Sequence, residues 1–194
     1  EEPSLGVHHL THDITPYNTF EASYRLFQTV EYWPKGTTFV SVVDPGVGSS
    51  RKSVVALTKT GQYIVTPDNG TLSYIKKDVG IVAVREISEV ENRRSNTELS
   101  YTFHGRDVYA YTGAKLASGH ISFEEVGPEL PVDKILEFPV VETIIEENLV
   151  RGAIDILDVR FGSLWTSITR DDFYALEPNF GDRFEVTIFN NDML

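Results

Sequence analysis

The stretch Thr37-Thr38-Phe39-Val40-Ser41-Val42-Val43 is followed directly by Asp44-Pro45-Gly46-Val47-Gly48-Ser49-Ser50-Arg51. The first seven residues are rich in β-branched side chains and predict a strand. The two glycines after it suit a backbone that turns sharply and stands close to a ligand. Open α/β sheets bind small molecules at this position, just beyond the end of a strand. The two segments therefore predict an α/β fold with a small-molecule site near Asp44.

Other segments of the first two thirds of the chain fit the same architecture. Further strands, rich in Val, Ile or Thr and bounded by turn residues, are predicted at residues 53–58, 62–66 and 80–84. The sequence Pro67-Asp68-Asn69-Gly70 is typical of a turn. This mixture of strands with the helices described next indicates an α/β domain.

Two helices are predicted from capping and spacing signals. Asn18 and Glu21 have the spacing of a capping box, and the apolar residues after them recur at helical intervals as far as Trp33. A second helix is predicted over residues 107–118, and Gly119 is a typical helix stop. Its expected packing face consists of Ala110, Ala114 and Ala117.

The pattern of predicted secondary structure changes near Phe138. Beyond it, short strand-like segments alternate with turns, at residues 140–146, 153–158, 164–169 and 183–189. We therefore expect an N-terminal α/β domain at residues 1–137 and a small C-terminal β domain at residues 138–194.

Composition narrows the class of protein. The chain has 194 residues, of which 41% are hydrophobic, enough for a buried core. Its net charge of −12 argues against nucleic acid or an anionic membrane as a partner, because phosphate groups require clusters of Lys and Arg. The lack of cysteine excludes disulfides, a thiolate zinc site and a cysteine nucleophile. A cationic small molecule suits this charge better.

The ends of the sequence carry little targeting information. No apolar run approaches the roughly 20 residues of a membrane span, and Glu1-Glu2-Pro3 lacks the basic and apolar regions of a signal peptide. A cytoplasmic location is therefore expected. The single methionine is Met193, so we expect the sequence to be a processed chain or part of a longer one.

Asp44, Arg51 and His104 are the candidate catalytic residues. Each lies near the end of a predicted strand, and an acid, a guanidinium and an imidazole can together hold one water molecule. Each also has a structural alternative. Asp44 before Pro45 is typical of a turn in which the side chain bonds to the backbone, Arg51 fits a solvated surface charge, and His104 fits a core histidine.

Two further motifs have weaker functional interpretations. His8, His9, His12 and Asp13 include the i, i+4 spacing of metal ligands, but histidines in a segment that runs into a turn more often satisfy backbone groups. The run 46–53 is glycine-rich like a phosphate loop. It lacks the Gly-Lys-Ser/Thr ending and precedes a predicted strand, which disfavours nucleoside triphosphate binding.

Five motifs occur in order between about residues 10 and 170. They are Thr11-His12-Asp13-Ile14-Thr15-Pro16-Tyr17, Val43-Asp44-Pro45-Gly46-Val47-Gly48 with Arg51, Pro67-Asp68-Asn69-Gly70, Phe103-His104-Gly105-Arg106-Asp107-Val108, and Phe161-Gly162 with Trp165-Thr166. Together they resemble the S-adenosyl-L-methionine (SAM) hydrolases, also called SAM hydroxide adenosyltransferases. This family is related to the SAM-dependent fluorinase and chlorinase.

The resemblance implies a Rossmann-like N-terminal α/β domain and a small β-barrel-like C-terminal domain. It also implies a homotrimer in which SAM lies between the N-terminal domain of one subunit and the C-terminal domain of its neighbour. The catalytic triad of the family falls on Asp44, Arg51 and His104. The expected SAM-contacting residues are Tyr17, Asp158, Phe161 and Ser163. No cofactor or metal is expected, since SAM is the substrate.

The chain departs from the family pattern in two ways. Ser163 and Ser167 stand where the family usually has asparagine, and a hydroxyl reaches less far than an amide. The family also begins with a strand leading into an Asp-Phe-Gly turn and ends with a segment that recognises adenine, and neither occurs here. We therefore expect the first strand of the N-terminal domain to be missing and the C-terminal domain to be truncated.

The function that the resemblance implies is hydrolysis of SAM to adenosine and L-methionine by in-line attack of an activated water on ribose C5′. Halogenating relatives carry tyrosine at the position of Asp44. A carboxylate there would repel a halide ion and could accept a proton from water. The alternatives are a SAM-dependent halogenase and a non-catalytic protein that binds SAM or adenosine.

Overall fold

The computed structural model describes residues 3–189 and divides into two compact units, Glu1–Pro139 and Val140–Leu194. The first unit contains a mixed sheet with strand order β1-β3-β2-β4-β5. Its strands are β1 (Thr38–Val40), β2 (Ser53–Thr58), β3 (Tyr63–Pro67), β4 (Ile81–Glu86) and β5 (Glu129–Leu130). Only β1 and β3 pair in parallel among these strands, and the other pairs are antiparallel. The expectation of an α/β fold is confirmed at this level.

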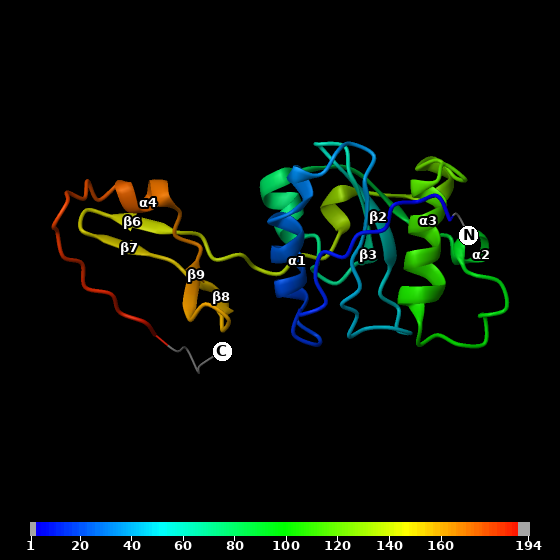
Figure 1. Cartoon of the computed structure of the whole chain (residues 1–194), viewed down its shortest axis with the longest axis horizontal. Coiled ribbons are helices and arrows are strands. Elements are labelled where there is room, and N and C mark those ends of the chain that lie inside the picture. Colours follow the sequence, from blue (N-terminus) through cyan, green and yellow to red (C-terminus); the bar gives the residue numbers. More distant parts are fainter. Residues whose placement is uncertain (1–2, 190–194) are drawn as a thin grey trace. The chain divides into compact units, whose positions relative to one another are not determined.

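Both faces of the sheet are buried, as the sequence of β2 requires. Val54 and Ala56 point to one face and Val55 and Leu57 to the other, because successive side chains alternate across a strand. The first face packs against α1 (Thr19–Phe27) through Leu26. The second packs against α3 (Tyr111–Ala117) and the wide helical turn η3 (Gly105–Ala110). Figure 1 shows α1 and α3 on opposite sides of β2 and β3.

Short helical segments connect these elements. They are the 3-10 helices η1 (Val30–Tyr32), η4 (Glu124–Val126) and η5 (Val132–Lys134), the π-helical turn η2 (Ile75–Val79) and the single-turn helix α2 (Glu89–Asn92). The helices η3 and α3 follow each other without a break, so the residues after His104 begin with π-helical geometry. Such geometry is frequent at functional sites.

The helix predictions are right in position and partly wrong in detail. Asn18 caps α1 by accepting from the Glu21 amide, but the Glu21 carboxylate accepts from the Thr15 amide instead of closing the capping box on Asn18. The helix ends at Phe27, before Trp33. The stop at Gly119 is confirmed by its positive φ of 72°.

The packing face predicted for the second helix is wrong. Ala110 and Ala117 are exposed, and the buried positions are Asp107, Val108, Tyr109, Thr112, Gly113 and Leu116. Gly113 explains the difference, because a Cβ atom there would lie 2.7 Å from Val40 Cγ2. The helix therefore approaches β1 most closely at a glycine rather than at a row of alanines.

The second unit contains two separate antiparallel ladders. The pairs are β6 (Ile144–Glu146) with β7 (Leu149–Arg151), and β8 (Ile154–Asp158) with β9 (Ser163–Thr166). A short helix, α4 (Arg170–Tyr174), follows, because Thr169 and Asp172 form a capping box that the sequence analysis missed. The strand predicted over residues 183–189 is wrong, since these residues have no regular secondary structure.

Across residues 3–189, none of the helices has the length and apolar character that crossing a membrane requires.

Candidate active site

Asp44 and Arg51 lie at the two ends of the loop that joins β1 to β2. The Val43 carbonyl just before Asp44 accepts from the Asn69 side chain at 2.8 Å, so the turn at Pro67–Gly70 fixes the start of the loop. The backbone turns at Asp44, whose carbonyl accepts from the Val47 amide. The loop thus holds both side chains beside the sheet.

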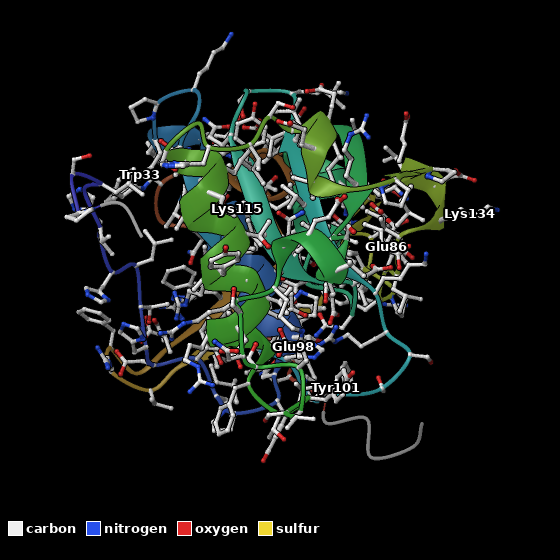
Figure 2. All side chains as sticks on the ribbon, turned by 90° about the vertical axis from the view of Figure 1, so that its right-hand side faces the viewer. Trp33, Glu86, Glu98, Tyr101, Lys115 and Lys134 are labelled. Atoms are coloured by element: carbon white, nitrogen blue, oxygen red, sulfur yellow. The ribbon has the colours of Figure 1, made fainter. Side chains whose placement is uncertain are left out.

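Gly48 is required by its conformation and its surroundings. Its φ is 78°, in the left-handed region that favours glycine, and a Cβ atom there would lie 3.2 Å from the Tyr101 carbonyl oxygen. The loop therefore runs close to the segment that leads to His104. Figure 2 shows that segment, with Glu98 and Tyr101 labelled.

The structure brings Asp44, Arg51 and His104 into direct contact. Arg51 Nε donates to Asp44 Oδ1 at 2.8 Å, and Arg51 Nη2 donates to Asp44 Oδ2 at 2.5 Å. The same Nη2 lies 2.9 Å from His104 Nδ1. All three side chains are less than a tenth exposed. The guanidinium of Arg51 is therefore the bridge between the carboxylate and the imidazole.

These contacts bear on two of the structural alternatives, those for Asp44 and Arg51. Within residues 3–189, the Asp44 carboxylate bonds to Arg51 and Tyr109, while the turn is closed by the Asp44 backbone carbonyl. Arg51 is buried, so it is not a solvated surface charge. The alternative phosphate-loop interpretation is wrong, because the run 46–53 leads into strand β2.

Two buried hydroxyl groups complete the cluster, and the sequence analysis missed both. Arg51 Nη1 donates to Ser53 Oγ at 2.8 Å, Ser53 Oγ contacts the Tyr109 hydroxyl at 3.2 Å, and that hydroxyl donates to Asp44 Oδ2 at 3.3 Å. Burial raises the pKa of Tyr109 well above its usual value, so its hydroxyl stays protonated and remains a donor. Ser53 follows Arg51 by two residues and Tyr109 follows His104 by five. This closeness in sequence was the only signal that could have predicted them as site residues.

A second guanidinium lies on the other side of His104. Arg93, which follows α2, places Nη2 3.1 Å from His104 Nε2 and 2.5 Å from Glu89 Oε2. Burial lowers the pKa of His104 below its usual value, Arg51 and Arg93 lower it further, and Glu89 and Asp44 partly oppose this. The lowered pKa favours the neutral form of the His104 imidazole.

The cluster can orient and polarise a small nucleophile. A carboxylate offers about four lone-pair directions, and three donors from Arg51 and Tyr109 point at Asp44. Within the described chain, the contacts to Asp44, His104 and Ser53 use four of the five N–H groups of Arg51. One acceptor direction and one donor thus remain for a water molecule.

The other predicted site residues lie apart from this cluster in sequence. Tyr17 is 78% exposed and has a φ of 70°. Asp158, Phe161 and Ser163 share the β8–β9 hairpin, where Asp158 pairs with Ser163 and accepts from the amide of Phe161. These three residues are therefore gathered on one turn of the second unit.

The histidines near the amino terminus contact each other and an aromatic ring. His9 Nδ1 contacts His12 Nε2 at 2.9 Å, and His8 lies against the Trp33 ring. Among the described residues, no group of three or more potential ligands is gathered closely enough to hold a metal ion.

The first unit is a sheet covered by helices on both faces, with Asp44 after β1, Arg51 before β2 and His104 just before η3 meeting in one cluster, and it places the chain among the α/β proteins. Residues 1–127 match the family described as the SAM hydroxide adenosyltransferase N-terminal domain. The chain therefore belongs to the SAM hydroxide adenosyltransferase family.

Individual relatives agree with this family. The chain is 34% identical to an (R)-S-adenosyl-L-methionine hydrolase of Methanocaldococcus jannaschii over 164 residues, covering 84% of this chain and 54% of that protein. The corresponding enzyme of Thermus thermophilus is 35% identical over 179 residues, covering 87% of this chain and 65% of that protein. A fluorinase of Actinopolyspora mzabensis is 26% identical, covering 91% and 66%. The chain thus spans between 54% and 65% of the length of the two hydrolases.

Solved structures support the same relationship. An uncharacterized conserved protein from Thermotoga maritima superposes with a TM-score of 0.85 at 37% identity, covering 93% of this chain and 66% of that one. A conserved hypothetical protein from Thermus thermophilus gives a TM-score of 0.62 at 31% identity, covering 81% and 57%. The fold of the chain is therefore shared with homologous proteins.

Proposed function

We propose that the protein hydrolyses SAM to adenosine and L-methionine. The observation that carries this proposal is the buried contact of Arg51 with both Asp44 and His104. The names of the two hydrolase relatives support it, because both are more similar to this chain than the fluorinase is.

The chemistry of SAM explains what such a cluster must supply. The sulfonium makes methionine a good leaving group, since it departs as a neutral thioether and needs no acid. The difficult partner is water, which must be made more nucleophilic and aimed in line with the C5′–S bond. As the oxygen of water bonds to C5′, the C5′–S electron pair stays on sulfur, and one water proton is released.

Each residue of the cluster has a role in this proposal. Asp44 accepts a hydrogen bond from the water and orients it, and Arg51 stabilises the negative charge that develops on its oxygen. His104 is the neutral neighbour that fixes the water or passes on its proton. Fixed charges and dipoles in a site without water lower the activation free energy by several kcal/mol. A general base raises the rate by about 10²- to 10⁴-fold, which is a similar free energy. Arg51 is therefore expected to matter as much as Asp44.

The expected binding residues and assembly belong to the same proposal. Tyr17 from the first unit and Asp158, Phe161 and Ser163 from the second would contact SAM at an interface of a homotrimer. The exposure of Tyr17 (78%) and Phe161 (85%) is compatible with such an interface, since both side chains are accessible to a ligand or a neighbouring subunit. The finer fold expectation, a Rossmann-like and a barrel-like domain, is supported by the parallel β1–β3 pair and the antiparallel ladders of the second unit.

Incubation with SAM in ¹⁸O-labelled water tests the reaction. Mass analysis is expected to show adenosine with label in the 5′-hydroxyl, together with unlabelled L-methionine. A parallel incubation with chloride or fluoride is expected to give no 5′-halo-adenosine. Halogenated nucleoside would favour the halogenase, and calorimetric SAM binding with no nucleoside released would favour a binding protein.

A further inference from the structure

Both ring nitrogens of His104 face arginine side chains. Nδ1 lies 2.9 Å from Arg51 Nη2, and Nε2 lies 3.1 Å from Arg93 Nη2. A guanidinium donates hydrogen bonds and accepts none, and a neutral imidazole has one acceptor nitrogen. An imidazolium has no acceptor and would turn an N–H group toward each guanidinium. In the neutral form one ring nitrogen accepts a hydrogen bond from its arginine, and the other turns its N–H toward the second guanidinium. Protonation would make both contacts donor against donor, so the arrangement favours the neutral form of His104.

The charged groups around His104 come from every element packed against it. Arg51 and Asp44 approach from the β1–β2 loop, and Arg93 and Glu89 approach from α2 and the residue after it. The aromatic rings of Tyr101 and Tyr109 lie edge-on to the imidazole, at centroid distances of 6.3 Å and 6.4 Å. Two cations thus face the imidazole nitrogens directly. Asp44 lies behind Arg51, while Glu89 and the buried carboxylate of Asp107 both interact with Arg93.

Arg93 is itself held in place by several contacts. Its Nη2 donates to Glu89 at 2.5 Å, its Nη1 donates to the Ser100 carbonyl at 3.4 Å, and its guanidinium lies 5.2 Å from the centre of the Tyr101 ring. The Arg93 side chain is 6% exposed, while that of Glu89 is 35% exposed. Burying a guanidinium costs free energy, which the contact with Glu89 and the charge of Asp107 offset in part. The contact with His104 therefore suggests a functional reason for burying the Arg93 guanidinium.

We propose that Arg93, anchored by Glu89 and Tyr101, is a positioning residue that keeps His104 neutral and fixes its ring against the Arg51–Asp44 pair. Arg93, the residue that directly follows α2, is thereby assigned to the site. Among the described residues it contacts His104 but not Asp44. Arg93 acts through His104, and Glu89 sets the direction of its guanidinium.

Titration of the histidine resonances by NMR tests this proposal without any assumption about the reaction. The chain has five histidines, and the His104 signal is identified by its loss in His104→Asn. In Arg93→Met, the titration midpoint of His104 is expected to rise by about one pH unit or more, because one of two adjacent cations is gone. Arg93→Lys retains the charge and is expected to keep the midpoint nearer to that of the unchanged protein.

Arg94→Met is the matched control. Arg94 is the next residue, is exposed, and loses the same charge on substitution, so it reports any long-range effect of net charge. An unmoved His104 midpoint in Arg93→Met, or an equal shift in Arg94→Met, would overturn the proposal. Should Arg93→Met fail to fold, Arg93→Gln tests the same point, since glutamine is neutral and still donates a hydrogen bond.

A kinetic measurement extends the test and rests on the proposed function. In Arg93→Met, the acid limb of the pH–rate profile for adenosine release is expected to move up by the same amount as the NMR midpoint. A shifted NMR midpoint without any adenosine release would support the role of Arg93 and contradict the hydrolase. Adenosine release together with the same His104 midpoint in Arg93→Met as in the unchanged protein would support the hydrolase and contradict the role of Arg93.

Discussion

Arg51 donates two hydrogen bonds to the carboxylate of Asp44, from Nε to Oδ1 at 2.8 Å and from Nη2 to Oδ2 at 2.5 Å. Both side chains are less than a tenth exposed. Two planar groups held in this way have little freedom to rotate. The pair is therefore a rigid platform on which the His104 imidazole and a reactant water can be positioned.

Arg51→Lys is expected to lower turnover by about 10²- to 10³-fold, the usual cost of removing one fixed donor from a charge-stabilising site. Lysine keeps the charge but cannot donate to Asp44, His104 and Ser53 at once. Adenosine release measured by chromatography checks this. Lys52→Arg is the control, because Lys52 forms an exposed ion pair with Glu86. Turnover that survives Arg51→Lys would remove the guanidinium from the mechanism.

Asp44→Asn is expected to destabilise the protein by about 3–5 kcal/mol, because it leaves the buried Arg51 guanidinium without its counter-charge. Urea unfolding followed by circular dichroism measures this free energy. The same substitution at Asp133, whose pair with Lys134 is exposed, is expected to change stability by about 0.5 kcal/mol or less. Equal losses in the two variants would show that burial of the Asp44–Arg51 pair has no special cost.

Tyr109→Phe removes one hydroxyl and leaves the aromatic ring in the core. The hydroxyl donates to Asp44 and contacts Ser53, so its loss is expected to cost about 0.5–1.5 kcal/mol of stability and to lower turnover. Because burial raises the pKa of Tyr109, turnover is not expected to show a tyrosine titration at alkaline pH. Tyr63→Phe, in β3 and beside the same hydrophobic cluster, is the control. A Tyr109→Phe variant as active as the unchanged protein would limit the cluster to the three predicted residues.

The stability of the protein is expected to fall as the pH drops below about 6.5, the ordinary pKa of histidine. The pKa of His104 is lowered in the folded state, so between its folded and unfolded pKa values the unfolded chain binds one more proton. Stability therefore rises with pH across this window, by at most about 1.4 kcal/mol per pH unit, and the contribution is complete above a pH of about 6.5.

Urea unfolding between about pH 5.5 and 7.5, on either side of the ordinary histidine pKa, measures this slope, which His104→Asn is expected to reduce. His120→Asn is the control, because His120 is exposed beside Ser118. The same slope in His104→Asn as in the unchanged protein would show that His104 does not titrate differently on folding.

Local sequence signals located most elements of the first unit. The strands at β2, β3 and β4 were predicted within two residues, because each is a short β-branched run between turn residues. The alanine face of the second helix was wrong, because close approach to β1 at Gly113 overrides the alanine spacing. The strand predicted at residues 183–189 was also wrong, since a β-branched pattern without a pairing partner does not become a strand.

The sequence by itself determined the α/β character and the turn after β1, because strand composition and glycine placement are local properties. It named Asp44, Arg51 and His104 as candidates, and the family resemblance singled them out. Only the tertiary structure decided which groups complete the cluster. Ser53 and Tyr109 carry only the weak signal of lying close to Arg51 and His104 in the sequence, and Glu89 and Arg93 carry none. They meet because β2, η3 and α2 converge on one buried imidazole and one buried guanidinium. Buried ionised groups need hydrogen-bonding or charged partners, and the packing of distant segments decides which groups are close enough to serve. No single segment of the sequence specifies that packing.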